Sequence, residues 1–345
     1  MQQDKNDALQ ALRGIAVLLV VLMHSLTTAN RPMFEFLQIG DAGVKIFFAI
    51  SGYIIARSIV KLNPEDAWLF MRRRIIRIVP LYWLFTAVYA ATHIGTTSIS
   101  DLLASMFFIP YLAKPNTPMH PVLGQGWSLN FEMAFYVLAA GVMLFASKRR
   151  WFLYLIGPMA LFSLLPEPRD AGISLLLLAD HRLWFFILGV LIAWANPRIS
   201  KNLSYDNAVF FMLSWSFLLF LYNNDPQIYR VLQFFTAGLF LYVAVICNNH
   251  SATAPGMRPP RTLAAIGDAS YSTYLSHGFV LGLIDRTLDS AYIQSNPMVT
   301  YCTVILCTVL SIIVGQIVYE FLERPMLQRL NAAFGQRRKP AQQQT

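Results

Sequence analysis

Long apolar segments recur along almost the whole of this 345-residue chain, and they restrict its fold more than any other feature. A helix needs roughly 20 residues to cross the hydrocarbon core of a bilayer, which is about 30 Å thick. We expect about ten such helices around a polar cavity inside the membrane, and therefore an all-α integral membrane protein. The expected spans cover residues 9–28, 42–60, 78–94, 127–146, 151–165, 175–194, 208–222, 231–247, 263–284 and 298–321.

The composition excludes several other classes of protein. Hydrophobic residues make up 56% of the chain and charged residues only 13%, whereas a soluble domain has about 25% charged residues. The formal net charge of +9 would suggest nucleic-acid binding in a soluble chain. Here the basic residues lie in short runs between apolar segments, so we expect no nucleic-acid partner. The three cysteines lie in apolar segments without a metal or redox motif, and we expect no metal and no bound cofactor.

The basic residues also predict how the chain is oriented. Lysine and arginine are enriched in cytoplasmic connections, and here they occupy every second connection between the expected spans. Ten spans put all of these connections on one side, with both chain ends in the cytoplasm. We therefore expect a multi-pass protein of the cell (inner) membrane, with one transmembrane domain over residues 1–325 and a basic, Gln-rich tail over 326–345. The basic connections hold Lys61 with Arg72, Arg73, Arg74 and Arg77, then Lys148 to Arg150, Arg198 with Lys201, Arg258 with Arg261, and Arg337 to Lys339.

Two ionisable residues lie within the first expected span. Arg13 and His24 are eleven residues apart, which places them on nearly the same helix face and about 16 Å apart along the axis. A buried ionisable group costs at least a few kcal/mol in hydrocarbon, so each needs a reason. His24 suits general-base catalysis because a free imidazole has a pKa of about 6.5. The alternatives are a structural histidine bonded to a neighbouring helix, and an arginine that extends to the membrane surface.

Four further titratable residues are expected at the depth of His24. They are Lys45, Glu132, Arg182 and His277, each from a different span. Each alone is explained by a contact between helices, but together they predict a shared polar cavity. Glu132 can orient an imidazole or pair with a cation, and the sequence leaves both open.

Arg74 and Arg77 lie on one helical face because they are three residues apart. Two guanidinium groups in this arrangement can hold phosphate groups through paired hydrogen bonds. The alternative is an anchor that contacts anionic membrane lipid.

Seven segments, in this order, resemble those of the membrane-bound acyltransferase-3 family. The first segment contains Arg13, and His24 follows Arg13 after ten intervening residues, a spacing that also resembles the family. They are LRGIA (12–16), FFAISGY (47–53), RIIRIVPLYW (74–83), WSLNFEMAFY (127–136), RLWFFILG (182–189), GDASYSTYLSH (267–277) and ERP (323–325).

The resemblance implies an enzyme that moves an acyl group, often acetyl, from cytoplasmic acyl-CoA to a hydroxyl of a carbohydrate. The acceptor would be a surface polysaccharide or a glycolipid precursor, and acetyl-CoA would be a co-substrate. The resemblance implies His24 as the catalytic base with Glu132 beside it, and Arg13, Arg74 and Arg77 as contacts of the acyl donor. The cavity would further include Lys45, Ser51, Arg182, Tyr271 and His277.

Some members of the family carry a soluble hydrolase-like domain after the last span. This chain ends about 20 residues beyond it, so we expect it to complete the transfer alone or to pass the acyl group to a separate polysaccharide-assembly protein. The main alternative is a multi-span transporter or flippase, which predicts no acyl-CoA hydrolysis. A purely structural membrane partner would leave the polar residues unexplained.

Overall fold

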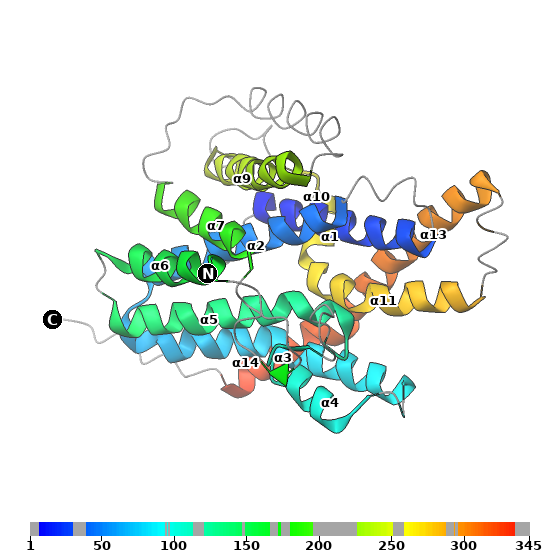
Figure 1. Ribbon diagram of the computed structural model, residues 1–345, viewed down its shortest axis with the longest axis horizontal. Coiled ribbons are helices and arrows are strands. Elements are labelled where there is room, and N and C mark those ends of the chain that lie inside the picture. The colour runs from blue at the N-terminus through cyan, green and yellow to red at the C-terminus, as the bar shows by residue number, and fades with distance from the viewer. Residues whose placement is uncertain are drawn as a thin grey trace.

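Helices form nearly all of the described chain in the computed structural model (Figure 1). The structure describes residues 7–29, 39–93, 95, 97–112, 121–146, 149–165, 172–173, 180–195, 226–250, 259–287, 293 and 296–334. The helices are α1 (Asp7–Thr28), α2 (Ile39–Lys61), α3 (Ala67–Thr92), α4 (Ile99–Met106), α5 (Trp127–Phe145), α6 (Trp151–Ser163), α7 (Leu183–Ala195), α9 (Pro226–His250), α10 (Arg261–Asp268), α11 (Ser270–Thr287), α13 (Pro297–Val318) and α14 (Arg324–Phe334). Two short strands, β1 (Tyr111–Leu112) and β2 (Gly172–Ile173), pair antiparallel.

The structure confirms the prediction of an all-α integral membrane protein. Within the described residues, five helical stretches are long and apolar enough to cross a membrane. These are Asp7–Thr28, Asp41–Lys61, Pro64–Thr92, Gly124–Phe145 and Pro297–Phe334, and shorter apolar helices cover Trp151–Ser163, Leu183–Ala195 and Val231–Cys247. The expected span 208–222 and the start of the span 175–194 lie outside the described residues.

Helix α3 begins earlier than predicted. The expected span started at residue 78, with the basic residues before it in a connecting loop. Instead the helix begins at Ala67, directly after a 3₁₀ turn at Pro64–Asp66. Ala67, Phe70 and Ile76 supply a buried side to this first part of the helix. Arg72, Arg73, Arg74 and Arg77 therefore lie on a helix, so the helical geometry decides which face of α3 each side chain occupies.

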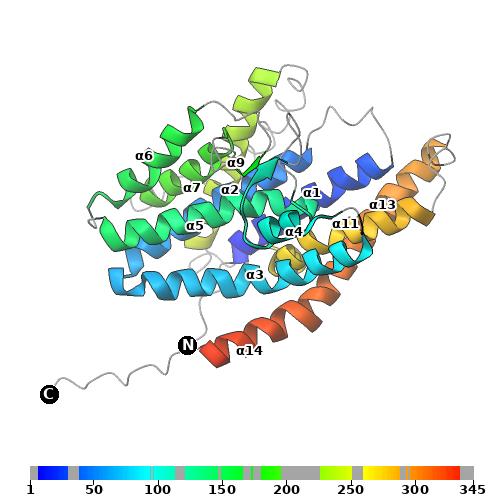
Figure 2. The same ribbon diagram turned by 60° about the horizontal axis from the view of Figure 1, so that its bottom comes forward.

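The predicted span 263–284 is two helices rather than one. Helix α10 ends at Asp268 and α11 begins at Ser270, with Ala269 between them. Helix α10 packs closely against α1, because a Cβ on Gly267 would lie only 1.7 Å from the carbonyl oxygen of Gln10. Because of the break, α10 packs along α1. Helix α11 runs beside α13 instead, as Figure 2 shows.

The last predicted span, 298–321, is also longer than expected. Helix α13 continues through a π-helical turn, Tyr319–Glu323, into α14. Glu323 in this turn is buried and accepts a hydrogen bond from the hydroxyl of Ser272 on α11. The predicted tail boundary after residue 325 falls inside α14, and residues 335–345 lie outside the described part of the chain.

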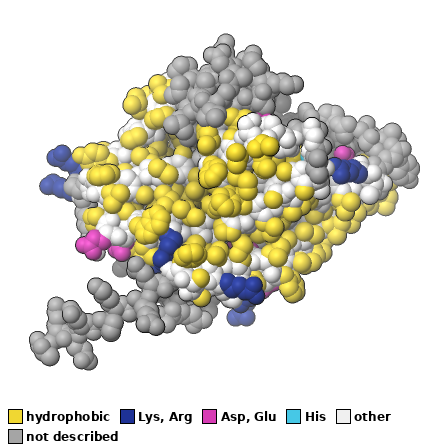
Figure 3. All heavy atoms as spheres, turned by 90° about the horizontal axis from the view of Figure 1, so that it is seen from below, with side chains coloured by type: hydrophobic (Ala, Val, Ile, Leu, Met, Phe, Trp, Pro, Cys, Tyr) yellow, Lys and Arg dark blue, Asp and Glu magenta, His cyan; other side chains and the backbone are white. Residues whose placement is uncertain are grey.

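The outer surface of the helices is apolar. Hydrophobic side chains cover most of the face in Figure 3, and lysine and arginine side chains occur there in a few separate groups. Large side chains point outward on several helices, including Phe145 on α5, Ile305 on α13 and Leu161 on α6. Exposed apolar surface of this extent fits contact with hydrocarbon rather than with water.

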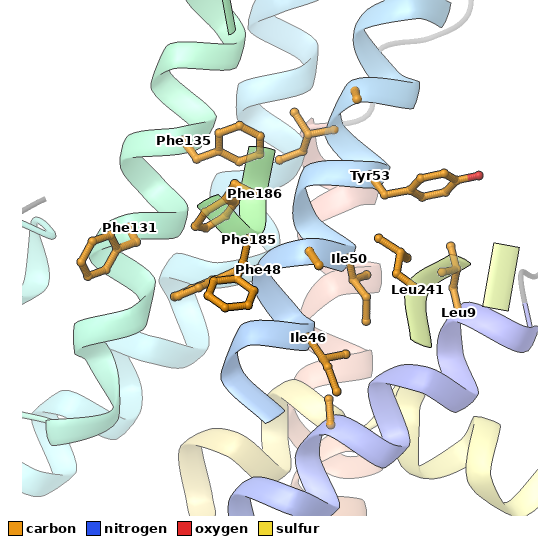
Figure 4. Close-up of a cluster of buried hydrophobic side chains, with 14 of the residues drawn as sticks. Leu9, Ile46, Phe48, Ile50, Tyr53, Phe131, Phe135, Phe185, Phe186 and Leu241 are labelled. Carbon is orange, nitrogen blue, oxygen red and sulfur yellow. The ribbon is translucent and has the colours of Figure 1, made fainter. Parts of the chain in front are cut away.

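Aromatic side chains fill the centre of the bundle. Phe48 of α2 stacks on Phe186 of α7 with 4.6 Å between ring centroids, and Phe135 of α5 lies 4.7 Å from the same ring. Figure 4 shows these rings where the three helices meet. Aromatic rings in this arrangement contribute beyond their buried area, so they hold α2, α5 and α7 together.

Glycines bring the backbones of α2 and α7 into direct contact. A Cβ on Gly52 would lie 2.2 Å from the carbonyl oxygen of Phe186, and a Cβ on Gly189 would lie 2.0 Å from that of Ala49. Small residues of this kind allow membrane helices to approach closely. The FFAISGY and RLWFFILG segments thus contain the two halves of one helix contact.

Replacing Gly189 with valine should therefore destabilise the protein. The new side chain would meet the α2 backbone, which cannot rotate away, and overpacking of this kind costs typically about 1–3 kcal/mol. The measurement is the thermal unfolding midpoint in detergent. Gly141→Val on α5 is the matched control, because no atom lies within 4 Å of a Cβ there. An equal loss of stability in both variants would contradict the close contact between α2 and α7.

Candidate active site

The seven segments noted in the sequence meet one another in the structure. Each is joined to at least one other by a hydrogen bond, a ring contact or a glycine contact. The joining pairs are Arg13 with Ser270, Ser51 with Glu132, Arg74 with Tyr136, the Ile78 carbonyl with Tyr271, Arg182 with Trp127, Gly52 with Phe186, and Ser272 with Glu323. One connected region therefore contains all of them.

A cavity of about 930 Å³ opens beside α1, α3 and α11. His24 and His277 lie in its wall with Asp41 from the start of α2, Gln125 from the 3₁₀ turn before α5, and Trp127 from the start of α5. The C-terminal halves of α3 and α11 complete the wall with Tyr89, Thr92, His93, Phe279, Asp285 and Arg286. Mixed aromatic, amide and charged groups of this kind can bind a large polar molecule.

One ring nitrogen of His24 is held, and the other has no hydrogen-bond partner among the residues that the structure describes. His24 is exposed to the cavity, and its Nδ1 donates a hydrogen bond to the Val20 carbonyl at 2.8 Å. A carbonyl oxygen can only accept, so Nδ1 carries the proton of the neutral ring and Nε2 keeps a lone pair. His24 is thus arranged to accept a proton at Nε2 from a molecule in the cavity.

His277 lies beside His24 but is almost fully enclosed. The ring centroids are 5.0 Å apart, and His277 is only 1% exposed. Its Nδ1 donates to the Tyr274 carbonyl at 2.7 Å, so the same argument leaves its Nε2 as an acceptor. Of the two histidines, His24 is the one that a substrate can reach.

A second, smaller pocket of about 50 Å³ lies next to the large cavity. Arg13, Ser51, Glu132 and Tyr271 line it. Glu132 accepts hydrogen bonds from Ser51 at 3.1 Å and from the Tyr136 hydroxyl. It therefore lies in the smaller pocket, while His24 lies in the larger one.

Arg13 points into the protein and is not extended to the membrane surface. Its Nε and Nη2 donate to the Ser270 hydroxyl at 3.2 and 3.0 Å. Its charge interacts with those of Arg77, Glu132 and Glu323. The wall of the smaller pocket thus carries opposite charges on Arg13 and Glu132, and Arg77 and Glu323 lie close to Arg13 without lining the pocket.

Arg74 and Arg77 belong to the same region. The Arg74 guanidinium lies over the rings of Phe70 and Tyr136, at 5.3 and 5.4 Å. Both arginines are half-buried, whereas Arg73, directly before Arg74, is exposed. This region holds three arginines, at positions 13, 74 and 77, and two glutamates, at positions 132 and 323. The excess of one positive charge suits an anionic ligand.

Lys45 and Arg182 approach the large cavity only through other residues. Lys45 is buried and donates to Asp41 and to Gln233. Arg182 pairs with Asp180 at 2.8 Å and lies 4.7 Å from the Trp127 ring. Because Asp41 and Trp127 face the cavity, these two cations fix its wall. The sequence predicted one shared cavity, but the structure has two pockets, one with His24 and one with Glu132. Lys45 and Arg182 lie behind the wall of the larger one.

Sequence reasoning did not single out Tyr136, Ser270, Tyr274 or Gln125. The signal for Tyr136 was its position four residues after Glu132, which puts both on one helix face. Ser270 and Tyr274 show the same spacing within one segment. Gln125 precedes α5 in a Gly-Gln-Gly turn, and its role became visible only in three dimensions. Within the described residues, no group of three or more His, Cys, Asp or Glu is placed to hold a metal ion.

A match to a known protein family identifies the kind of protein that carries this site. The model of a family described as an acyltransferase domain, of the acyltransferase-3 type, matches residues 6–316. The chain belongs to the acyltransferase-3 family. This makes it a multi-pass membrane acyltransferase, and it confirms the resemblance inferred from the seven segments.

Several curated proteins are similar to this acyltransferase. The exopolysaccharide production protein ExoZ of Rhizobium meliloti (strain 1021) is 30% identical over 84% of this chain and 90% of its own length. The putative peptidoglycan O-acetyltransferase YrhL of Bacillus subtilis and the O-acetyltransferase OatA of Staphylococcus aureus are each 25% identical, over 92% and 94% of this chain. The chain spans only 54% and 58% of the lengths of these two relatives. No solved structure gives a significant match.

Proposed function

We propose that this membrane acyltransferase transfers an acetyl group from acetyl-CoA to a hydroxyl of a surface polysaccharide or glycolipid precursor. The observation that carries the proposal is the free Nε2 of His24, which faces a large cavity in a member of an acyltransferase family. The name of ExoZ supports an exopolysaccharide as acceptor, and the names of OatA and YrhL support O-acetylation.

His24 acts as the general base in this proposal. Its Nε2 takes the proton of the acceptor hydroxyl while the hydroxyl oxygen attacks the thioester carbon. The carbon–sulfur bond then breaks, and the imidazolium returns the proton to the CoA thiolate. The products are an O-acetyl ester and free CoA. The cavity limits hydrolysis of the thioester as far as it excludes water from the reacting carbon.

The acyl-CoA donor is proposed to bind with its phosphates at the end of the site away from His24. Arg13, Arg74 and Arg77 would hold the CoA phosphates through charge-assisted hydrogen bonds. Helix α3 supports this division, because Arg77, whose charge interacts with Arg13 of the smaller pocket, and Tyr89, which lines the large cavity, are about 18 Å apart along this helix. Glu132 would keep the arginines in place and neutralise part of their charge.

The basic connections support a membrane orientation with both chain ends and the Leu62 to Asp66 turn in the cytoplasm. Single cysteines introduced in that turn should then be protected from an impermeant thiol reagent in intact cells. Cysteines introduced into α4 should react. Labelling of both positions would contradict this orientation.

The proposed activity is tested by mass spectrometry of surface polysaccharide and glycolipid from cells with and without the gene. Loss of material heavier by one acetyl group is the expected result. Membranes that contain the purified protein should also release CoA from acetyl-CoA only when the acceptor is present. Unchanged acetylation without the gene, together with no release of CoA, would reject the proposal.

A further inference from the structure

Gln125 lies in the wall of the large cavity with its backbone fixed and its side-chain amide unengaged. It belongs to the 3₁₀ turn Gly124–Gly126 before α5. Its backbone carbonyl accepts a hydrogen bond from the Tyr274 hydroxyl of α11 at 3.0 Å. The side-chain amide makes no hydrogen bond to any residue that the structure describes. Its N–H groups are therefore available to a molecule in the cavity.

Gly278 of α11 makes room for this amide. A Cβ on Gly278 would lie 2.0 Å from Nε2 of Gln125, and the three atoms nearest to such a Cβ all belong to the Gln125 side chain. Gly278 directly follows His277, whose ring centroid is 5.0 Å from that of His24. The amide therefore packs on α11 directly after His277, in the cavity wall that also holds His24.

Acyl transfer from a thioester needs a hydrogen-bond donor as well as a base. When the hydroxyl oxygen bonds to the thioester carbon, the second electron pair of the C=O bond moves to the oxygen. This oxygen carries a negative charge until the carbon–sulfur bond breaks, and side-chain amides are among the donors that stabilise such a charge. The Nε2 atoms of His24 and His277 are acceptors in the neutral rings and cannot serve in this role.

We propose that the side-chain amide of Gln125 donates a hydrogen bond to the thioester carbonyl oxygen while its negative charge develops. The inference rests on the proposed function, in which His24 takes the proton of the acceptor hydroxyl. Gln125 keeps both of its amide protons, and no covalent bond to it forms or breaks. Because Tyr274 holds its backbone and Gly278 lies against its side chain, the donor is in place before the reaction begins.

The test measures kcat and the KM for acetyl-CoA in Gln125→Ala and Gln125→Glu, in membranes and normalised to the amount of inserted protein. Loss of one such donor lowers kcat by about 10²–10³-fold. The KM should stay unchanged, because the interaction strengthens only in the transition state. Glutamate keeps the size of the side chain, but an ionised carboxylate cannot donate and repels the oxyanion. A residue that only fills space would retain its function in Gln125→Glu.

Gly278→Ala tests where the amide lies. The added methyl group requires the amide to move, so kcat should fall in this variant as well. Only the end of a flexible side chain is displaced, so the protein should still fold. In Gln125→Ala the methyl group has room, and adding Gly278→Ala should cause no further loss. Gly157→Ala on α6 is the matched control, because no atom lies within 4 Å of a Cβ there.

Near wild-type kcat in Gln125→Glu would overturn the inference, as would a loss of transfer that a raised KM explains entirely. A further fall in kcat when Gly278→Ala is added to Gln125→Ala would also overturn it. If Gln125→Ala does not fold, Gln125→Glu and Gly278→Ala decide. A wild-type enzyme that releases no CoA from acetyl-CoA in the presence of the acceptor would instead reject the proposed function.

Discussion

Replacing His24 with glutamine should reduce acyl transfer by about 10²–10⁴-fold, the usual cost of losing a general base. The amide of glutamine can still form hydrogen bonds, but it cannot take the proton from the acceptor hydroxyl. His24→Ala should be as damaging. The measurement is acetyl transfer in membranes, normalised to the amount of correctly inserted protein.

The folded protein should survive both changes to His24. Its Nδ1 bond is made to a backbone carbonyl of its own helix, and even a bond between membrane helices is worth only about 0.6–2 kcal/mol. His181→Gln is the matched control, because the His181 side chain is 46% exposed. Near wild-type transfer by His24→Gln would leave His24 a structural residue, and the enclosed His277 would become the candidate base.

Replacing Arg77 with lysine should raise the KM for acetyl-CoA by about tenfold, the effect of losing one charge-assisted hydrogen bond. Lysine keeps the positive charge near Glu323, so the buried carboxylate stays compensated. It loses the planar group that can hold a phosphate through two bonds. An effect on donor binding alone leaves kcat unchanged.

Arg74→Lys should have a similar effect, because Arg74 also loses its stacking on Tyr136. Arg73→Lys is the control from the same helix, since Arg73 is exposed. An unchanged KM in both Arg74→Lys and Arg77→Lys would favour the alternative in which these arginines only contact anionic lipid.

Hydropathy predicted the long helices well because it reports the same property that a membrane selects. The expected span 9–28 is α1 at Asp7–Thr28, and the span 127–146 is α5 at Trp127–Phe145. It failed where a helix continues with charged residues, as α3 does before residue 78. A window of apolar residues cannot distinguish the end of a helix from the end of the hydrocarbon.

The site was predictable as a set of residues but not as an arrangement. Helical spacing shows which residues share a face, and the family resemblance supplied the candidates among them. Neither could pair Ser51 with Glu132, 81 residues away, or Arg13 with Ser270, 257 residues away. The position of Tyr274, which lines both pockets, depends on the direction of one ring, and contacts with Phe47, Ser128 and the Gln125 carbonyl decide that direction.

The glycine contact between α2 and α7 also limits how this enzyme can move. Because each backbone rests directly on the other at Gly52 and Gly189, the pair can neither slide nor separate without losing contact along its length. It behaves as a fixed frame. Helix α3 touches α11 at only a few positions, and both border the cavity of His24. Under the proposed function, we expect room for a carbohydrate acceptor to come from shear between α3 and α11 against that frame, as packed helices slide in small steps.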